Sequence, residues 1–501
     1  MKSRLPLRII LAATLAAGFL PGGCRPKAIP PDNLAVVNKA LFDTSSNFYV
    51  EFDEYPDDLR NLPIGVFDSG TGGLTVLEKI LSLDSFDNIT GIAGRDSILD
   101  FAGEHFIYLA DQANMPYGNY ESEGNNAYLE ELVVKDALFL MDDDYFSNAI
   151  EEDPSGRKAR VKIIVVACNT ATAYGLDLIQ SMVDQSGTGI KVIGVINAGV
   201  SATLDELDIK EGDAPFAIGV LATPGTIASG AYERTLREEL SARGITSRID
   251  IVNQSGYGFA EAVDSDPDYV NPLLFAPRSS YRGPALGEAD NSIKENLLKA
   301  YNFDFSENKM LARRSPGGGY ASLQLNSADN YARFNMVSLV EKHRQTGSGT
   351  PIKAIILGCT HYPFHIETLQ QVLEELKDYR EDGRYPYRDL IADDVKFIDP
   401  AVYTAIECYS TLRKDGNLAY RITPTKVEAY ISVPSNLLVD TCLTSDGMLT
   451  YEYKYGRTPG SEELSTKQVP FSSSNIDKNN LQRIEERLPY TFSLIAPSIQ
   501  H

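Results

Sequence analysis

Short runs of apolar residues recur along the chain, and each stops at a cluster of glycine and small polar residues. Continuous β-branched runs are typical of strands that are buried on both faces of a parallel sheet. Helical patterns follow several of them, over residues 74–83 and 231–242, and this alternation predicts an α/β fold. Ligands bind in such folds just beyond the carboxyl ends of the strands, where the polar clusters lie. The runs are residues 64–67, 161–167, 191–196, 217–221 and 353–357.

Long polar stretches interrupt this alternation. Residues 84–104 and 119–159 are expected to be insertions. Residues 264–349 are a longer stretch of mixed composition, and its glycine-rich run 313–319 is expected to be a flexible loop. Near the end of the chain, alternating polar and apolar residues over 426–433 and 450–455 predict strands. We therefore expect a β-rich C-terminal extension.

The first 24 residues have the pattern of an export signal. A basic start precedes an apolar run of 12 residues, 9–20, which is too short to cross a bilayer as a helix. The run ends at Pro21-Gly22-Gly23-Cys24, which resembles a bacterial lipoprotein signal whose cysteine receives lipid and becomes the first residue. We expect lipidation at Cys24 and a place in the bacterial cell envelope, anchored to a membrane and facing the periplasm or exterior. The alternative is an ordinary signal peptide in which Cys24 is incidental.

Composition narrows the function classes. The formal net charge of −23 argues against nucleic acid as a partner, because the surface would repel phosphates. Five cysteines in 501 residues exclude a disulfide-stapled scaffold. Five histidines and the absence of a C-x-x-C pair predict no metal site.

Two cysteines stand at the ends of predicted strands. Cys168 is followed by Asn169 and Thr170, and Cys359 by Thr360 and His361. Either thiol alone is most simply a small apolar filler of the core. Together, with hydrogen-bonding neighbours where a sheet opens to solvent, they indicate a site for a small polar ligand. A catalytic thiol needs a base or a dipole that favours the thiolate.

Six segments in order resemble the cofactor-independent glutamate racemase family. Several ordered motifs are far more specific than any one of them. They are residues 64–76 (IGVFDSGTGGLTV), 108–118 (YLADQANMPYG), 167–173 (ACNTATA), 218–232 (IGVLATPGTIASGAY), 357–363 (LGCTHYP) and 397–401 (FIDPA).

The resemblance implies two pseudo-symmetric α/β domains with the substrate between them. We expect a signal peptide over 1–23, a tether and weakly structured lead-in over 24–61, and a first racemase domain over 62–208. A second domain follows over 209–384, with an insertion at 264–349. Residues 385–501 then return to the first domain and add the C-terminal extension.

The resemblance also implies the chemistry. The reaction is a racemisation of glutamate or a related acidic amino acid without a cofactor, with one thiol on each face of the α-carbon. By analogy Cys168 acts on the D-enantiomer with help from Asp68, and Cys359 acts on the L-enantiomer with help from His361. A homodimer is a further assembly that we leave open. The residues implied to hold the substrate are Ser69, Tyr117, Gly118, Asn169, Thr170 and Thr360, with Thr223 and Thr226 as weaker candidates.

The chain departs from the family pattern in two places. Asn197 stands where the family usually has an acid, and the segment 254–257 (QSGY) replaces a Gln-Ala-Cys-Pro-like one. The carboxylate that follows is Asp264 or Glu261. This region supports the site, so it bears on substrate choice more than on reaction type.

Other functions stay open at this point. The chain could be a catalytically silent, extracytoplasmic amino-acid-binding protein on the same fold, or a surface protein whose extensions carry the function. The family normally supplies D-glutamate for cell-wall peptidoglycan inside the cytoplasm, which an anchored copy outside would not serve directly. Cys408 and Cys442 are expected either to form a disulfide with each other or to stay buried.

Overall fold

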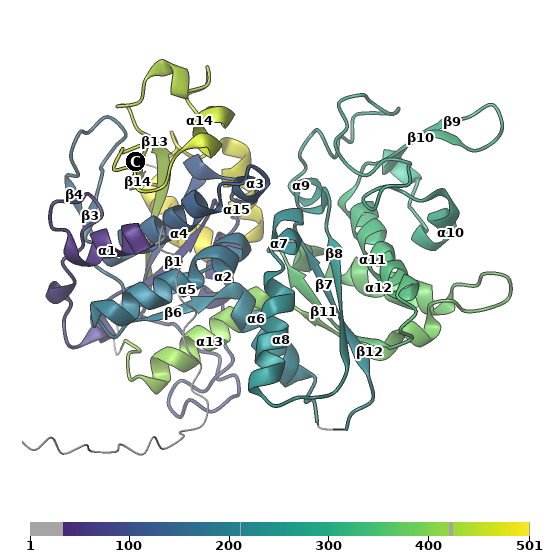
Figure 1. Ribbon diagram of the computed structural model, residues 1–501, viewed down its shortest axis with the longest axis horizontal. Helices are drawn as coiled ribbons and strands as arrows, with labels where there is room; N and C mark the ends of the chain where they lie inside the picture. Colours follow the sequence, from purple (N-terminus) through teal and green to yellow (C-terminus); the bar gives the residue numbers. More distant parts are fainter. Residues whose placement is uncertain (1–33, 211, 420–423, 500–501) are drawn as a thin grey trace, which may run out of the picture.

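Two sheets, each in its own lobe, organise the chain (Figure 1). The first sheet has the strand order β14-β13-β2-β1-β5-β6 and is parallel except for β14, while the second has the order β12-β11-β7-β8 and is wholly parallel. The five apolar runs form β1, β5, β6, β7 and β11, so the predicted α/β fold with mainly parallel sheets is confirmed. The strands of the two sheets are β1 (Ile64–Asp68), β2 (His105–Ala110), β5 (Ile163–Val166), β6 (Lys191–Gly194), β7 (Phe216–Ala222), β8 (Ile249–Ser255), β11 (Ile352–Gly358), β12 (Ile391–Ile398), β13 (Lys426–Pro434) and β14 (Thr466–Pro470).

The computed structural model describes residues 34–210, 212–419 and 424–499. The expected signal segment and Cys24 lie outside these residues. No helix in the described ranges has the length and apolar character needed to cross a bilayer. The helices are α1 (Leu34–Phe42), α2 (Leu74–Leu81), α3 (Gly118–Ser122), α4 (Asn126–Met141), α5 (Asn169–Ser186), α6 (Val195–Glu206), α7 (Pro224–Ala228), α8 (Ala231–Ala242), α9 (Phe259–Val263), α10 (Leu298–Tyr301), α11 (Ala328–Gln345), α12 (Ile366–Asp378), α13 (Pro400–Lys414), α14 (Tyr451–Gly456), α15 (Lys478–Arg487) and α16 (Pro489–Ile499).

Helices cover both faces of the first sheet, because alternate strand residues point to opposite sides. Phe67 of β1 belongs to a buried cluster that includes side chains of α1, α4 and α5, whereas Val66 belongs to a second cluster that includes side chains of α2, α13, α15 and α16. The chain leaves this lobe after α6 and returns at α13, and β13 then pairs with β2. The first lobe is therefore built from two separate stretches of sequence.

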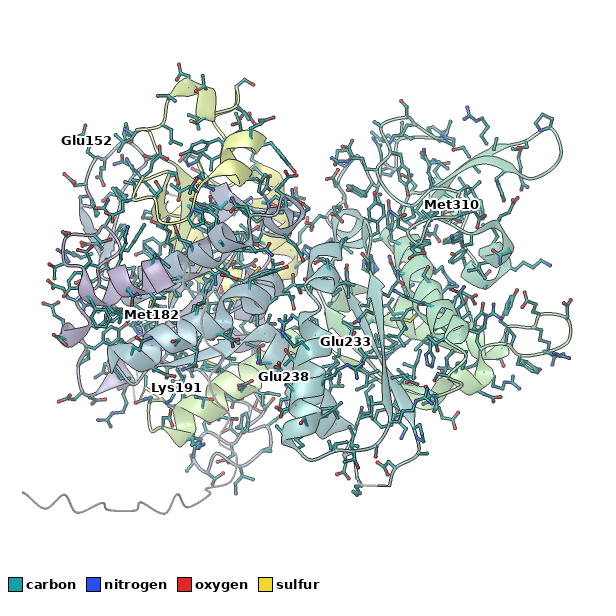
Figure 2. The ribbon with its side chains drawn as sticks, viewed as in Figure 1. Glu152, Met182, Lys191, Glu233, Glu238 and Met310 are labelled. Carbon is teal, nitrogen blue, oxygen red and sulfur yellow. The ribbon has the colours of Figure 1, made fainter. Side chains whose placement is uncertain are left out.

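The second sheet is covered in the same way. Ile355 of β11 belongs to a buried cluster that includes side chains of α9, α11 and α12, and Ile356 belongs to a cluster that includes side chains of α6 and α8. The helices α6 and α8 lie at the boundary between the lobes, where Figure 2 labels Glu233 and Glu238 of α8. Met182 of α5 and Met310 of the hairpin β9 (Met310–Arg314) and β10 (Tyr320–Leu325) lie in the first and second lobes respectively.

Three expected irregular stretches contain ordered elements. Within 24–61, helix α1 buries Val36, Val37 and Ala40 in the core of the first lobe, so residues from 34 onward do not form a loose tether. Within 119–159, the largely buried α4 packs on α5, and only the short hairpin β3 (Asp144–Tyr145) and β4 (Gly156–Arg157) follows it. Within 264–349, α11 covers the second sheet.

The C-terminal extension mixes strands and helices. The predicted strand at 426–433 is β13, but the strand predicted at 450–455 is wrong, because these residues form α14. Thr450 caps that helix by accepting a hydrogen bond from the Tyr453 amide, and the rings of Tyr451 and Tyr455 pack one turn apart, 4.7 Å between centroids. Tyrosine at every second position thus mimicked a strand.

Candidate active site

The predicted site residues follow the carboxyl ends of strands in both lobes. Asp68 ends β1, Cys168 stands two residues after β5, Thr223 follows β7 and Cys359 follows β11. Because neighbouring strands in each sheet are parallel, these residues share one edge of their sheet.

Cys168 lies at the N-terminus of the long helix α5. Its side chain is 7% exposed, its Sγ accepts a hydrogen bond from the Ala171 amide at 3.4 Å, and its thiol donates to Ser69 Oγ at 3.6 Å. Burial, followed by the charge of Asp68, raises the pKa of Cys168 to about 12. The amides at the helix N-terminus act against this rise in pKa, because they stabilise the thiolate. The thiol therefore holds its proton at rest, beside groups that can stabilise its anion.

Asp68 is held in the same loop. Its Oδ2 accepts a hydrogen bond from the Gly73 amide at 2.7 Å. Burial raises the pKa of this carboxyl, against the effect of that bond and of the thiol of Cys168. A buried carboxyl with a raised pKa beside a thiol has the properties of a proton partner.

Cys359 has a histidine as its partner. Its side chain is 7% exposed, and its Sγ lies 3.5 Å from Nδ1 of His361. The other ring nitrogen, Nε2, lies 3.2 Å from Oδ1 of Asp264. Burial lowers the pKa of His361, but the charge of Cys359 and the bond to Asp264 outweigh it and raise this pKa to about 10. Of the two carboxylates left open by the sequence, Asp264 is the one paired with His361.

The loops that carry the proton partners of the two thiols approach each other at Gly72. A Cβ placed on this glycine would lie 3.4 Å from Asp68 Oδ2, 3.6 Å from Thr360 Oγ1 and 3.9 Å from His361 Cε1. The Asp68 loop of the first lobe and the Cys359 loop of the second lobe therefore meet within a few ångströms. One small molecule at this boundary can reach groups from both lobes.

Further contacts join the lobes around this point. Tyr232 of α8 donates to Asn169 Oδ1 at 2.8 Å, and a Cβ on Gly225 would lie 3.0 Å from the Cα of Gly118. Asn169 and Gly118 therefore lie where the two lobes are in contact; that they hold the substrate stays a prediction. Tyr232 was not among the predicted residues, although it lies within a matching segment.

The remaining predicted substrate residues differ in how free their side chains are. The Ser69 hydroxyl accepts a hydrogen bond from the Cys168 thiol, and Thr360 Oγ1 lies 3.5 Å from His361 Nδ1. Thr170 is buried in the first turn of α5. The hydroxyl of Thr223 donates a hydrogen bond to that of Thr226, with 2.9 Å between the oxygens. The hydroxyl of Tyr117 is engaged by Asp111 at 2.5 Å and Asp136 at 2.7 Å. The Tyr117 side chain is therefore buried and already hydrogen-bonded within the first lobe.

Cys408 and Cys442 form no disulfide. Cys408 is buried in the core of the first lobe and Cys442 is partly exposed, and both are free thiols. Of the two expectations, the disulfide is wrong and burial holds for Cys408 only. Among the described residues no group of three or more histidine, cysteine, aspartate and glutamate side chains is arranged to hold a metal ion.

Comparison with known proteins finds glutamate racemases, although no family model matches the chain. The glutamate racemase of Carboxydothermus hydrogenoformans is 26% identical over 358 residues, which cover 72% of this chain and 83% of the relative. That of Lactobacillus johnsonii is 24% identical over 372 residues, covering 74% and 89%. That of Lactococcus lactis is 31% identical over 235 residues, covering 47% and 66%.

Solved structures of the same kind are found as well. Glutamate racemase from Francisella tularensis, in complex with D-glutamate, is 21% identical with a TM-score of 0.39, covering 74% of this chain and 89% of that one. A glutamate racemase isoform from Bacillus anthracis is 23% identical with a TM-score of 0.39, covering 74% and 88%.

Proposed function

We propose that this chain is a member of the glutamate racemase family, which its similarity to such racemases over most of its length supports, and that it interconverts L- and D-glutamate, or a close acidic relative, by proton transfer between two cysteines. The observation that carries the proposal is the pair of thiol sites at the lobe boundary. Each thiol has its own proton partner, Asp68 for Cys168 and His361 for Cys359. A protein that only bound an amino acid would have no need for two thiols so equipped.

The proposed reaction moves one proton off the α-carbon and another onto its opposite face. With D-glutamate, the Cys168 thiolate removes the α-proton, and the electron pair of the broken C–H bond is delocalised into the adjoining carboxylate. The Cys359 thiol then gives its proton to the other face and becomes a thiolate. With L-glutamate the roles are reversed. Two fixed acid–base groups avoid the movement that a single base would need to reach both faces.

The neighbouring groups supply the electrostatics. Amides at the start of α5 and hydroxyls such as those of Ser69 and Thr360 are fixed donors that can hold the substrate carboxylates as charge develops. Asp68 can take the Cys168 proton, and imidazolium at His361 favours the Cys359 thiolate. The chemistry therefore needs only side chains and backbone groups of this chain.

The test is α-proton exchange in deuterated water, with purified protein lacking residues 1–23. We expect both enantiomers of glutamate to racemise with incorporation of deuterium. Cys168→Ala and Cys359→Ala should each abolish racemisation while leaving the thermal midpoint near that of the parent. Cys442→Ala, which removes a partly exposed thiol elsewhere, is the matched control and should be fully active. Binding of glutamate without exchange would overturn the proposal in favour of a binding protein.

We further propose that the chain is exported and anchored through lipid on Cys24, as its first 24 residues suggest. Metabolic labelling with a radioactive fatty acid in a bacterial host tests this. Label on the parent but not on Cys24→Ala supports the anchor. Label on neither, with the mature chain starting elsewhere by mass spectrometry, overturns it.

A further inference from the structure

Helices α15 and α16 of the C-terminal extension are anchored in the first lobe. Ile484, Leu488, Ile495 and Ile499 are buried in its core against α2 and α13. Glu78 of α2 also accepts hydrogen bonds from the first amides of α16, those of Tyr490 at 3.1 Å and Thr491 at 2.7 Å. The position of α15 is therefore fixed relative to the first sheet.

The same helix reaches the second lobe beside His361. Arg483 forms an ion pair with Asp264, with Nη1 and Oδ1 2.5 Å apart. One turn later, Arg487 donates to the carbonyl of Val263 at 3.1 Å, and its guanidinium lies 5.2 Å from the centre of the Phe364 ring. Two arginines from the extension thus hold the end of α9 and the loop that carries His361.

Arg483 and His361 share one carboxylate oxygen. Oδ1 of Asp264 accepts from Nε2 of His361 at 3.2 Å and from Arg483, while Nδ1 of the same ring lies 3.5 Å from the Cys359 sulfur. A carboxylate oxygen shared between two cations binds each less tightly than it would alone. The guanidinium therefore limits how strongly Asp264 holds the proton on His361, and it fixes the direction from which the carboxylate approaches.

We propose that Arg483 is a positioning residue for the Cys359 half of the reaction, acting through Asp264 on His361. This inference rests on the proposed racemisation, in which Cys359 exchanges the proton of the L-enantiomer. It assigns a role to the C-terminal extension, which completes from the first lobe a proton-transfer pair that belongs to the second.

Several charged groups besides Arg483 act on the ring of His361. Any change in its titration has to be judged against all of them. They are Cys359 and Asp264 in contact, with Asp68 and Glu261 at longer range.

The experiment compares Arg483→Gln with Arg243→Gln. The two arginines are matched, since their side chains are 30% and 28% exposed and each pairs with a carboxylate at 2.5 Å. We expect Arg483→Gln to lower kcat about tenfold with KM nearly unchanged, Arg483→Lys to restore part of the loss, and Arg243→Gln to stay within about twofold of the parent.

Isotope effects separate positioning from a general loss of structure. If the Cys359 step alone becomes slower, the deuterium effect on kcat/KM should rise with α-deuterated L-glutamate and fall with α-deuterated D-glutamate. Unchanged isotope effects together with kcat within about twofold of the parent would overturn the inference, as would equal losses in Arg483→Gln and Arg243→Gln.

Titration of His361 needs no catalysis, so it tests the link between Arg483 and His361 separately from the proposed racemisation. The chain has five histidines, so their ring signals can be followed by NMR and His361 assigned with His361→Gln. We expect the His361 midpoint to rise in Arg483→Gln, because Asp264 then acts on the imidazolium alone, and to stay in place in Arg243→Gln. A parent that does not racemise glutamate refutes the proposed function, whereas an unmoved midpoint refutes the link between Arg483 and His361.

Discussion

A buried ion pair at the amino ends of β2 and β5 allows a prediction about the free energy of unfolding. Lys162, directly before β5, and Glu104, directly before β2, pair at 2.7 Å with side chains that are 0% and 2% exposed. The ammonium also donates to the carbonyls of Arg60 at 3.1 Å and Asn417 at 2.8 Å, and the carboxylate accepts from the Ala419 amide at 2.7 Å. The pair thus joins the lead-in, the sheet and the segment after α13.

The perturbation is Glu104→Gln, which keeps the shape of the side chain and removes its charge. The Lys162 ammonium then stays buried but loses the carboxylate 2.7 Å away, and breaking a buried pair in this way costs about 3–5 kcal/mol. Replacing both partners with apolar residues, as in Lys162→Met with Glu104→Leu, removes both buried charges and should recover much of the loss.

The assay is urea denaturation followed by circular dichroism, with heat denaturation as a second measurement. We expect Glu104→Gln to lower the thermal midpoint by about 3–5 °C. The matched control is Glu374→Gln, which breaks an exposed Lys377–Glu374 pair of similar length, 2.8 Å, and should cost less than about 0.5 kcal/mol. A cost below about 1 kcal/mol for Glu104→Gln, or a double variant less stable than the single one, would refute the reasoning.

Two further predictions concern the site. The pKa of Cys168 is raised from 9.0 to about 12, so the native state keeps a proton that the unfolded chain loses. Stability should therefore fall between about pH 9 and 12 by up to about 1.4 kcal/mol per pH unit, and Cys168→Ala should reduce that slope in urea titrations. In Gly225→Ala the new Cβ would lie 3.0 Å from the Cα of Gly118 and push the lobes apart, so kcat/KM should fall at least about tenfold. Gly317→Ala, where no atom lies within 4 Å, should leave activity unchanged, and equal activity of both variants would show that this approach is not needed.

Much of the sheet framework could be predicted because its strands carry their own signal. β1, β5, β7 and β11 are continuous apolar runs, and buried parallel strands leave few other uses for such runs. Helix α11 was missed because polar side chains interrupt its buried face; Asn330 and Asn335 are fully buried within it. Asn330 is satisfied there by hydrogen bonds to the backbone, which no local pattern reveals.

Some residues of the candidate site could be proposed from the sequence, and others could not. Cys168, Cys359 and His361 stand in segments whose order along the chain resembles a family, so they could be found from sequence. Arg483 could not, because its partner Asp264 lies 219 residues earlier and nothing near Arg483 marks it as unlike other arginines of an amphipathic helix. Only the folded chain brings the extension to this loop.

The strand order of the first sheet bears on how the protein is made. β13 pairs with β2 on one side and with β14 on the other, yet it begins at residue 426, after the whole second lobe has emerged from the ribosome. Until then the backbone of β2 is an open edge, and such edges invite pairing with other chains. A chain that stops before residue 426 would thus lack β13 and β14, and β2, from the middle of the largest sheet, would become an exposed edge strand. A cell would have to shield such a truncated chain or degrade it.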